Sequence, residues 1–265
     1  MDVPLLYSFP LWGVALIFLV LLLIALESGF RVGLRMRNSW KDAESGGGAV
    51  VLTSMFALLG LVLAFTYASG VSRFDARKNA VIQEANSLGT AFHRADLVAE
   101  PGRTELRRTL LEYARTRAFP PGSIKTVADL EAALKKTLEH LSKIWPATKK
   151  VIEQGEPAPR ESSLVAAING VLDVHTVRLA AVSDRLPSIV IWMLVFIAAA
   201  SLAVAGYNAG IQGRMSRWRM SAFALVLTGL MIVIMDFDRP NDGFVIVSNH
   251  SIYAVIAEME ANLKL

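Results

Sequence analysis

The sequence contains no cysteine, and charged residues make up only 19% of its 265 positions. Without cysteine there can be no disulfide, no thiolate metal ligand and no cysteine nucleophile. The HExxH, Walker, GxGxxG and GxSxG motifs are also missing, and the four histidines lie far apart along the chain. The net charge of +4 is modest for this length and does not indicate a nucleic-acid surface. We therefore expect a protein that is not an enzyme, with no cofactor, no metal site and no nucleic-acid partner.

Uncharged stretches, by contrast, are abundant, and hydrophobic residues make up 54% of the chain. About 20 apolar residues cross the roughly 30 Å of a bilayer's hydrocarbon core. Four windows qualify, although the last is short: residues 4–26, 49–69, 189–207 and 220–235. Asp2 stands where a signal peptide would be basic, and Glu27 where it would be cleaved, so we interpret the first window as a retained helix. No span carries an ionisable residue in its interior, which disfavours ion-coupled transport.

Between the second and third spans the chain is polar and shows helical periodicity. No proline interrupts residues 49–98, so the second span is predicted to continue into this region as one helix. Further helices are expected over residues 104–118, from about residue 126, and from about residue 163. The second of these should kink or break at Pro146, and its leucines share one face: Leu130, Leu134, Leu138 and Leu141. His175 lies on the apolar face of the last helix, where we interpret it as a hydrogen-bonded bundle residue.

These patterns predict an all-α integral membrane protein with four transmembrane helices and a helical soluble bundle inserted between the second and third. We divide the chain into residues 1–70 (first two spans), 71–186 (soluble bundle), 187–236 (last two spans) and 237–265 (amphipathic tail). The tail is expected to fold back against the bundle or a neighbouring subunit.

The second span presents two faces at helical spacing. Small residues, which let helices approach closely in lipid, occupy one face: Ala57, Gly60, Ala64 and Ala68. The other face carries pore or constriction candidates: Ser54, Leu58, Leu61 and Phe65. If copies of this helix surround an axis, one face packs and the other forms a hydrophobic constriction. Alternatively, both faces pack inside a monomeric bundle.

Both short connectors between spans are basic, and the cations are Arg31, Arg35, Arg37, Lys41, Arg214, Arg217 and Arg219. They are interpreted as interfacial anchors; for the first connector, the alternative is a site that collects anionic lipids or solutes. By the positive-inside tendency these connectors belong in the cytoplasm, which places the soluble bundle outside.

Three aspartates follow the last span, at positions 236, 238 and 242 beside Gly243. Their spacing does not match an EF-hand. We therefore interpret them as turn-capping and interface residues rather than calcium ligands.

At the junction LLGLVLAFTYASGVSRFDARKNAVIQEAN the sequence resembles the bestrophin-like bacterial membrane proteins of unknown function, and more remotely the bestrophin anion channels. The arrangement of two spans, a helical domain and two more spans is similar over nearly the whole chain. The motif residues that carry the resemblance are Arg73, Phe74, Asp75, Arg77, Glu84, Asn86, Asp238, Arg239, Pro240 and Gly243.

The resemblance implies a homo-oligomer, a pentamer as in the channels, in the bacterial inner (plasma) membrane. It also implies a hydrophobic neck at Leu58, Leu61 and Phe65, with inorganic anions as the permeating partners. It places the soluble bundle in the cytoplasm, opposite to the side indicated by the basic connectors. The acidic calcium clasp of the channels is missing, so calcium gating is not expected. The alternative function is a non-conducting, membrane-anchored helical scaffold that binds a partner protein.

Overall fold

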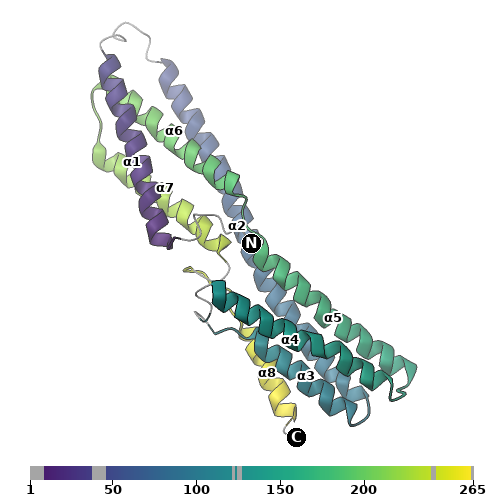
Figure 1. Ribbon diagram of the computed structural model, residues 1–265. Helices are drawn as coiled ribbons and strands as arrows, with labels where there is room; N and C mark the ends of the chain where they lie inside the picture. The colour runs from purple at the N-terminus through teal and green to yellow at the C-terminus, as the bar shows by residue number, and fades with distance from the viewer. Residues whose placement is uncertain (1–8, 38–45, 121–122, 124–126, 240–242, 264–265) are drawn as a thin grey trace. The chain divides into compact units, whose positions relative to one another are not determined.

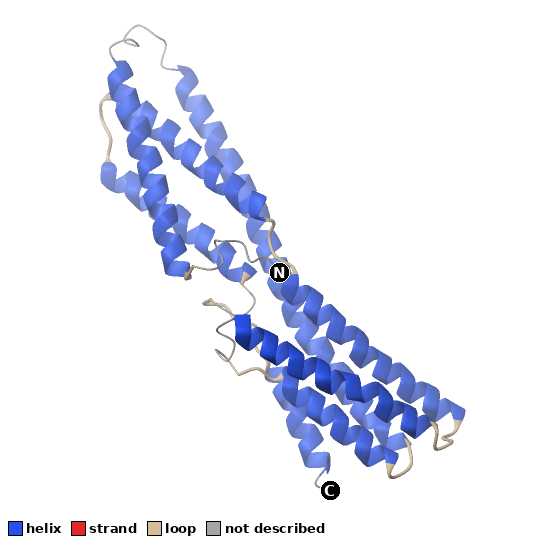
Figure 2. Ribbon diagram, viewed as in Figure 1, coloured by secondary structure: helices blue, strands red, loops and turns tan. Residues whose placement is uncertain are grey.

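The computed structural model describes residues 9–37, 46–120, 123, 127–239 and 243–263. Every regular element in these ranges is a helix (Figure 2). The elements are α1 (Leu11–Met36), α2 (Gly46–Arg94), the short 3-10 helix η3 (Ala95–Leu97), α3 (Gly102–Arg117), α4 (Val127–Ile152), α5 (Ala158–Ser183), α6 (Ser188–Gln212), α7 (Arg217–Asp238) and α8 (His250–Leu263) (Figure 1).

The helices form two compact units. The membrane unit contains residues up to Ser72 together with Arg185–Arg239, and the bundle unit contains Arg73–Asp184 together with residues 240–265. Helix α2 contributes to both, because it runs through residue 72 without interruption. The four helical stretches that are long and apolar enough to cross a membrane include α1, α6, α7 and the first part of α2.

In the membrane unit, α1 and α6 lie side by side and pack through glycine (Figure 1). A Cβ atom placed on Gly206 would lie 2.1 Å from the backbone oxygen of Leu26, and one on Gly210 would lie 2.3 Å from that of Phe30. Gly29 and Gly33 are equally close to the α6 backbone. Each helix thus offers two glycines four residues apart, the spacing that allows backbones to touch in lipid. The sequence analysis did not identify this pair of motifs.

The remaining core of the membrane unit is built from large apolar side chains of α1, α6 and α7, joined by Leu59 of α2. Helix α2 also makes specific contacts with its neighbours. Phe56 meets Phe223 of α7 edge to face at 5.3 Å between ring centroids, and Asn208 of α6 donates from Nδ2 to the Gly48 carbonyl at 3.0 Å. These contacts use only one narrow side of α2.

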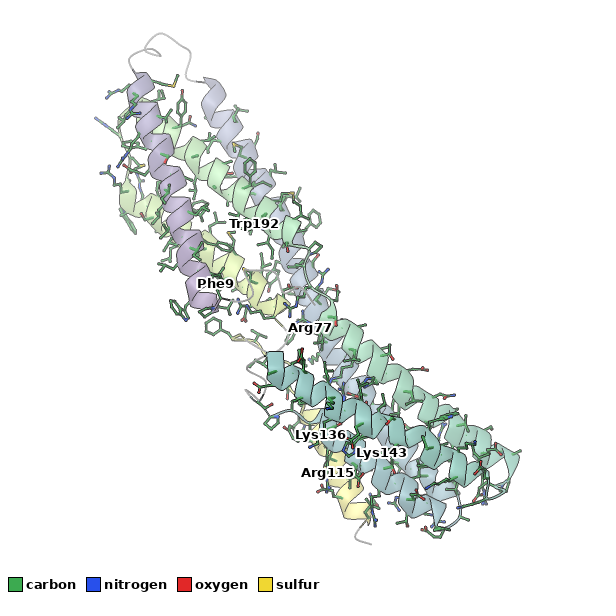
Figure 3. All side chains as sticks on the ribbon, viewed as in Figure 1. Phe9, Arg77, Arg115, Lys136, Lys143 and Trp192 are labelled. Carbon is green, nitrogen blue, oxygen red and sulfur yellow. The ribbon has the colours of Figure 1, made fainter. Side chains whose placement is uncertain are left out.

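The bundle unit packs α3, α4, α5, α8 and the second part of α2 around a continuous apolar core (Figure 1). Leu88 of α2, Leu110 of α3, Ile144 of α4 and Ile168 of α5 are all fully buried in it. Helix α8 lies against α3 and is held by an ion pair and a hydrogen bond. Arg115, labelled in Figure 3, pairs with Glu260 at 2.6 Å, and Arg107 donates to the Asn262 carbonyl at 3.1 Å.

For the third bundle helix, α4, a break at Pro146 was expected and does not occur. The helix continues through Pro146 to Ile152 without a break. Pro146 is exposed, so the carbonyl that its missing N–H leaves unpaired can bond to water. The buried stripe is also shifted from the leucine positions: Leu138 is 52% exposed, while Thr137, Ile144, Ala147 and Val151 face the core.

Candidate functional site

The constriction candidates of α2 are all exposed in the single chain. Leu58, Leu61 and Phe65 have exposed fractions of 50%, 54% and 66%. Ser54 is exposed too, and its hydroxyl donates to the Val50 carbonyl at 2.9 Å within the same helix. This face therefore presents an apolar surface with its one hydroxyl already bonded.

The small-residue face of α2 is exposed as well, at Ala57, Gly60, Ala64 and Ala68. A Cβ atom placed on Gly60 would meet no other heavy atom within 4 Å, in contrast with the crowded glycines of α1 and α6. Only 6% of the most apolar window of α2 is buried, against 28% for α1 and 39% for α7. If both faces of the α2 span packed inside a monomeric bundle, their residues would be buried, but among the described residues both faces are exposed.

Among the motif residues, Glu84 lies at the centre of a buried ionic cluster in the bundle unit. Its side chain is fully buried. The Nε atom of Arg117 donates to Oε1 of Glu84 at 2.6 Å, and Nη1 of Arg178 donates to Oε2. Three helices therefore meet at one carboxylate, because Glu84 lies on α2, Arg117 on α3 and Arg178 on α5.

Two neutral residues complete the contacts around Glu84. The Tyr113 hydroxyl donates to Oε1 of Glu84 at 2.9 Å and lies 3.0 Å from Nδ1 of His175. Because the hydroxyl has one hydrogen and the carboxylate can only accept, Nδ1 of His175 carries the proton and donates to the Tyr113 oxygen. The interpretation of His175 as a hydrogen-bonded bundle residue agrees with this contact. Its Nε2 atom is buried and has no hydrogen-bond partner among the described residues.

The electrostatics of this Glu84 cluster favour a charged carboxylate. Burial raises the pKa of Glu84, but the positive charges of Arg117 and Arg178 and their hydrogen bonds outweigh burial, so the pKa lies below its usual value. Burial, and then the Glu84 charge, raise the pKa of the Tyr113 hydroxyl. Burial, and then the charge of Arg117, lower the pKa of His175. At neutral pH the cluster thus holds two cations and one anion, with Tyr113 and His175 uncharged.

Asn249 links this cluster to the segment before α8. Its Oδ1 accepts from Nη2 of Arg178 at 3.1 Å, and its Nδ2 donates to the Phe119 carbonyl at 3.0 Å. The three charged groups of the cluster, Glu84, Arg117 and Arg178, are all hydrogen-bonded. The arrangement joins α2, α3 and α5 through one buried carboxylate.

The other motif residues of α2 differ in burial. Asp75 and Asn86 are exposed, and Phe74 is half-buried. Arg77 is buried, and Arg73 lies 3.2 Å from Asp184.

The closing motif lies partly outside the described residues, which exclude Pro240. Asp238 is buried and accepts from the Leu186 backbone N–H at 2.9 Å. Arg239 donates to the Phe9 carbonyl at 2.7 Å, and Gly243 has a φ of 141°, which favours glycine. No group of three potential metal ligands occurs among the described positions, which also exclude Asp242. The Asp238 contact joins the end of α7 to the segment before α6.

Taken together, the all-helical architecture and the four stretches long and apolar enough to cross a membrane define an α-helical membrane protein. A crystal structure of a variant of a bacterial bestrophin homolog from Klebsiella pneumoniae matches with a TM-score of 0.64 at 11% identity, covering 96% of each chain. A second structure of that homolog gives 0.62 at 10% identity, covering 94% of this chain and 95% of the other. At such identities the likeness concerns the fold alone. The comparison with curated proteins gives no match.

The sequence itself matches the Bestrophin-like domain over residues 14–252, and the chain belongs to this family. Both the resemblance drawn from the motif residues and the all-α membrane fold class are confirmed.

Sequence reasoning missed the partners of Glu84, namely Tyr113, Arg117 and Arg178, and it missed Asn249, which bonds to Arg178. One signal was present. Arg178 follows His175 by three residues on the same apolar stripe of α5, and two polar residues on a buried helix face usually bond to a partner.

Proposed function

We propose that this protein is a homo-oligomeric, passive anion-type channel whose α2 helices surround an axis and form a hydrophobic neck. The observation that carries this proposal is the exposure of both apolar faces of α2 in the single chain. Apolar bulk alone gives helices no reason to associate in lipid, but small residues allow close backbone packing. The small-residue face therefore packs against the next copy, and the face with Leu58, Leu61 and Phe65 lines the axis.

A neck of this kind conducts without ionisable groups. Rings of leucine and phenylalanine gate by excluding water from a narrow passage, so removing their bulk widens and wets it. Membership in the bestrophin-like family supports anions as the permeating ions, because the bestrophins, which this sequence resembles more remotely, are anion channels. By the same resemblance the oligomer is a pentamer.

Purified protein in planar bilayers tests the proposal. Chloride current is expected, and Phe65→Ala or Leu61→Ala should increase it. Phe196→Ala on α6 is the matched control, because Phe196 is similarly exposed at 73% but lies on another helix; its current should equal that of the unmodified protein.

A silent bilayer under varied pH and calcium, together with a monomeric or dimeric detergent particle, would exclude the channel. The combination would favour the non-conducting scaffold. Equal effects of Phe65→Ala and Phe196→Ala would retain conduction but remove α2 as its neck.

A further inference from the structure

An apolar groove opens on the membrane unit, and the proposed function does not use most of its residues. Its volume is about 430 Å³, and all of its lining residues are apolar. The walls come from three helices: Leu59 and Leu63 of α2, Ala205 of α6, and Phe223, Val226 and Leu230 of α7.

The groove has the length of one lipid leaflet. Along α7 it extends from Met220 to Leu230, which corresponds to about 15 Å at a rise of 1.5 Å per residue. The hydrocarbon core of a bilayer is roughly 30 Å thick. A groove that starts at the membrane interface would therefore end near the bilayer midplane, as one acyl chain does.

The end of the groove at Met220 lies beside a cluster of cations. Arg219 directly precedes Met220 and is exposed. Arg217 begins α7, with its Nε atom 3.8 Å from Glu27 and its guanidinium carbon 5.8 Å from the centre of the Phe30 ring. Trp218 between them is 76% exposed, as is typical of a side chain at the headgroup level. Glu27 also pairs with Arg31 at 3.1 Å. Further arginines follow α1 and α6 in the sequence: Arg37 and Arg214.

We propose that this groove is a binding site for an anionic phospholipid, with one acyl chain along α7 and the phosphate at Arg217 and Arg219. An acyl chain needs no hydrogen bonds, which agrees with walls that offer none. A phosphate requires cations at one end only, and the arginines supply them there. The groove shares Gly60 with the small-residue face of α2, but its α7 wall and Arg219 belong to neither predicted face of α2.

Native mass spectrometry of the full-length protein tests this site. The protein is purified in detergent and mixed with dioleoyl-phosphatidylglycerol or dioleoyl-phosphatidylcholine at equal concentration. The expected result is preferential retention of phosphatidylglycerol. Arg219→Gln should reduce that preference about fivefold, equivalent to about 1 kcal/mol for one basic residue near an anionic surface. Arg108→Gln, on the exposed surface of α3, should leave it unchanged.

A second pair of variants tests the groove itself. Val226→Trp fills it and should reduce retention of both lipids. Val233→Trp, on the same helix and also exposed but outside the groove, should not. Gly60 is left unmodified because the proposed channel uses it for helix packing.

Equal retention of the two lipids by the unmodified protein would overturn the proposal, and so would unchanged retention by Val226→Trp. Particles that retain no lipid but become smaller on Val226→Trp would show that a second copy of the chain occupies the groove, which also overturns it. None of these outcomes depends on current, so the lipid site and the channel succeed or fail separately.

Discussion

Replacing Glu84 by glutamine tests the ionic cluster of the bundle most directly. Glutamine keeps the shape of the side chain but removes its charge, and it leaves Arg117 and Arg178 buried around a neutral amide. Both guanidinium groups donate to Glu84, and the carboxylate is fully buried. Breaking a buried ion pair by removing one partner costs on the order of 3–5 kcal/mol, because the remaining charge is not compensated.

That loss is large enough to measure by thermal unfolding. A change of 1 kcal/mol shifts the melting temperature of a unit of this size by about 2–4 °C. We therefore expect Glu84→Gln to lower the melting temperature by on the order of 10 °C. Unfolding is measured by the tryptophan fluorescence of the full-length protein in detergent. Glu131→Gln, an exposed acid on α4, is the matched control and should change it by less than about 2 °C.

The pH dependence gives a second, independent readout. The pKa of Glu84 is lower in the folded protein than its ordinary value of 4.5, so its contribution to stability is complete above pH 4.5 and is lost as the pH falls through the lower folded value. The difference in melting temperature between the unmodified protein and Glu84→Gln should therefore be constant from neutral pH down to about 4.5 and shrink below it. A difference under about 2 °C at neutral pH, or one that does not shrink in acid, would refute the reasoning.

Three further predictions concern other contacts. Gly206→Leu should prevent stable packing of the membrane unit, because the Cβ atom alone would meet the Leu26 backbone. Gly229→Leu, with open space around it, should be tolerated, and the yield of monodisperse protein on size-exclusion chromatography distinguishes the two variants. Because the pKa of His175 is lowered in the folded state, its contribution to stability is complete above pH 6.5 and declines below it, so His175→Phe should flatten the decrease in melting temperature on acidification from pH 7.5. Asn249→Ala should lower the free energy of unfolding by about 1–3 kcal/mol, because it leaves Arg178 and the Phe119 carbonyl without this partner. Arg115→Gln loses only a half-exposed ion pair and should cost less than about 1 kcal/mol. Equal losses of the two variants in denaturant unfolding would contradict the burial argument.

The membrane helices could be predicted from the sequence because charge is a direct signal of lipid exposure. An uncharged window between Glu44 and Arg73 defines the span of α2 without reference to any other part of the chain. The continuity of α2 was equally predictable, since no proline or polar loop interrupts it.

Other features depend on tertiary contacts that periodicity does not contain. Pro146 breaks isolated helices, yet its neighbours Ile144 and Ala147 are buried in the bundle core, and this packing outweighs the lost hydrogen bond. Arg178 meets Glu84 from 94 positions away, so no local pattern could pair them. The groove beside α7 also arises only when three helices are assembled.

The glycine contact between α1 and α6 has a consequence for biosynthesis. Gly33 leaves the ribosome long before Gly210, and the whole of Arg73–Asp184 is translated between them. At about 5–20 residues per second, the first helix must wait on the order of ten seconds in the bilayer before its partner exists. During that interval its bare backbone groove is open to other small-residue helices. Premature pairing of α1 with such a helix is therefore the assembly error that we expect for this order of synthesis.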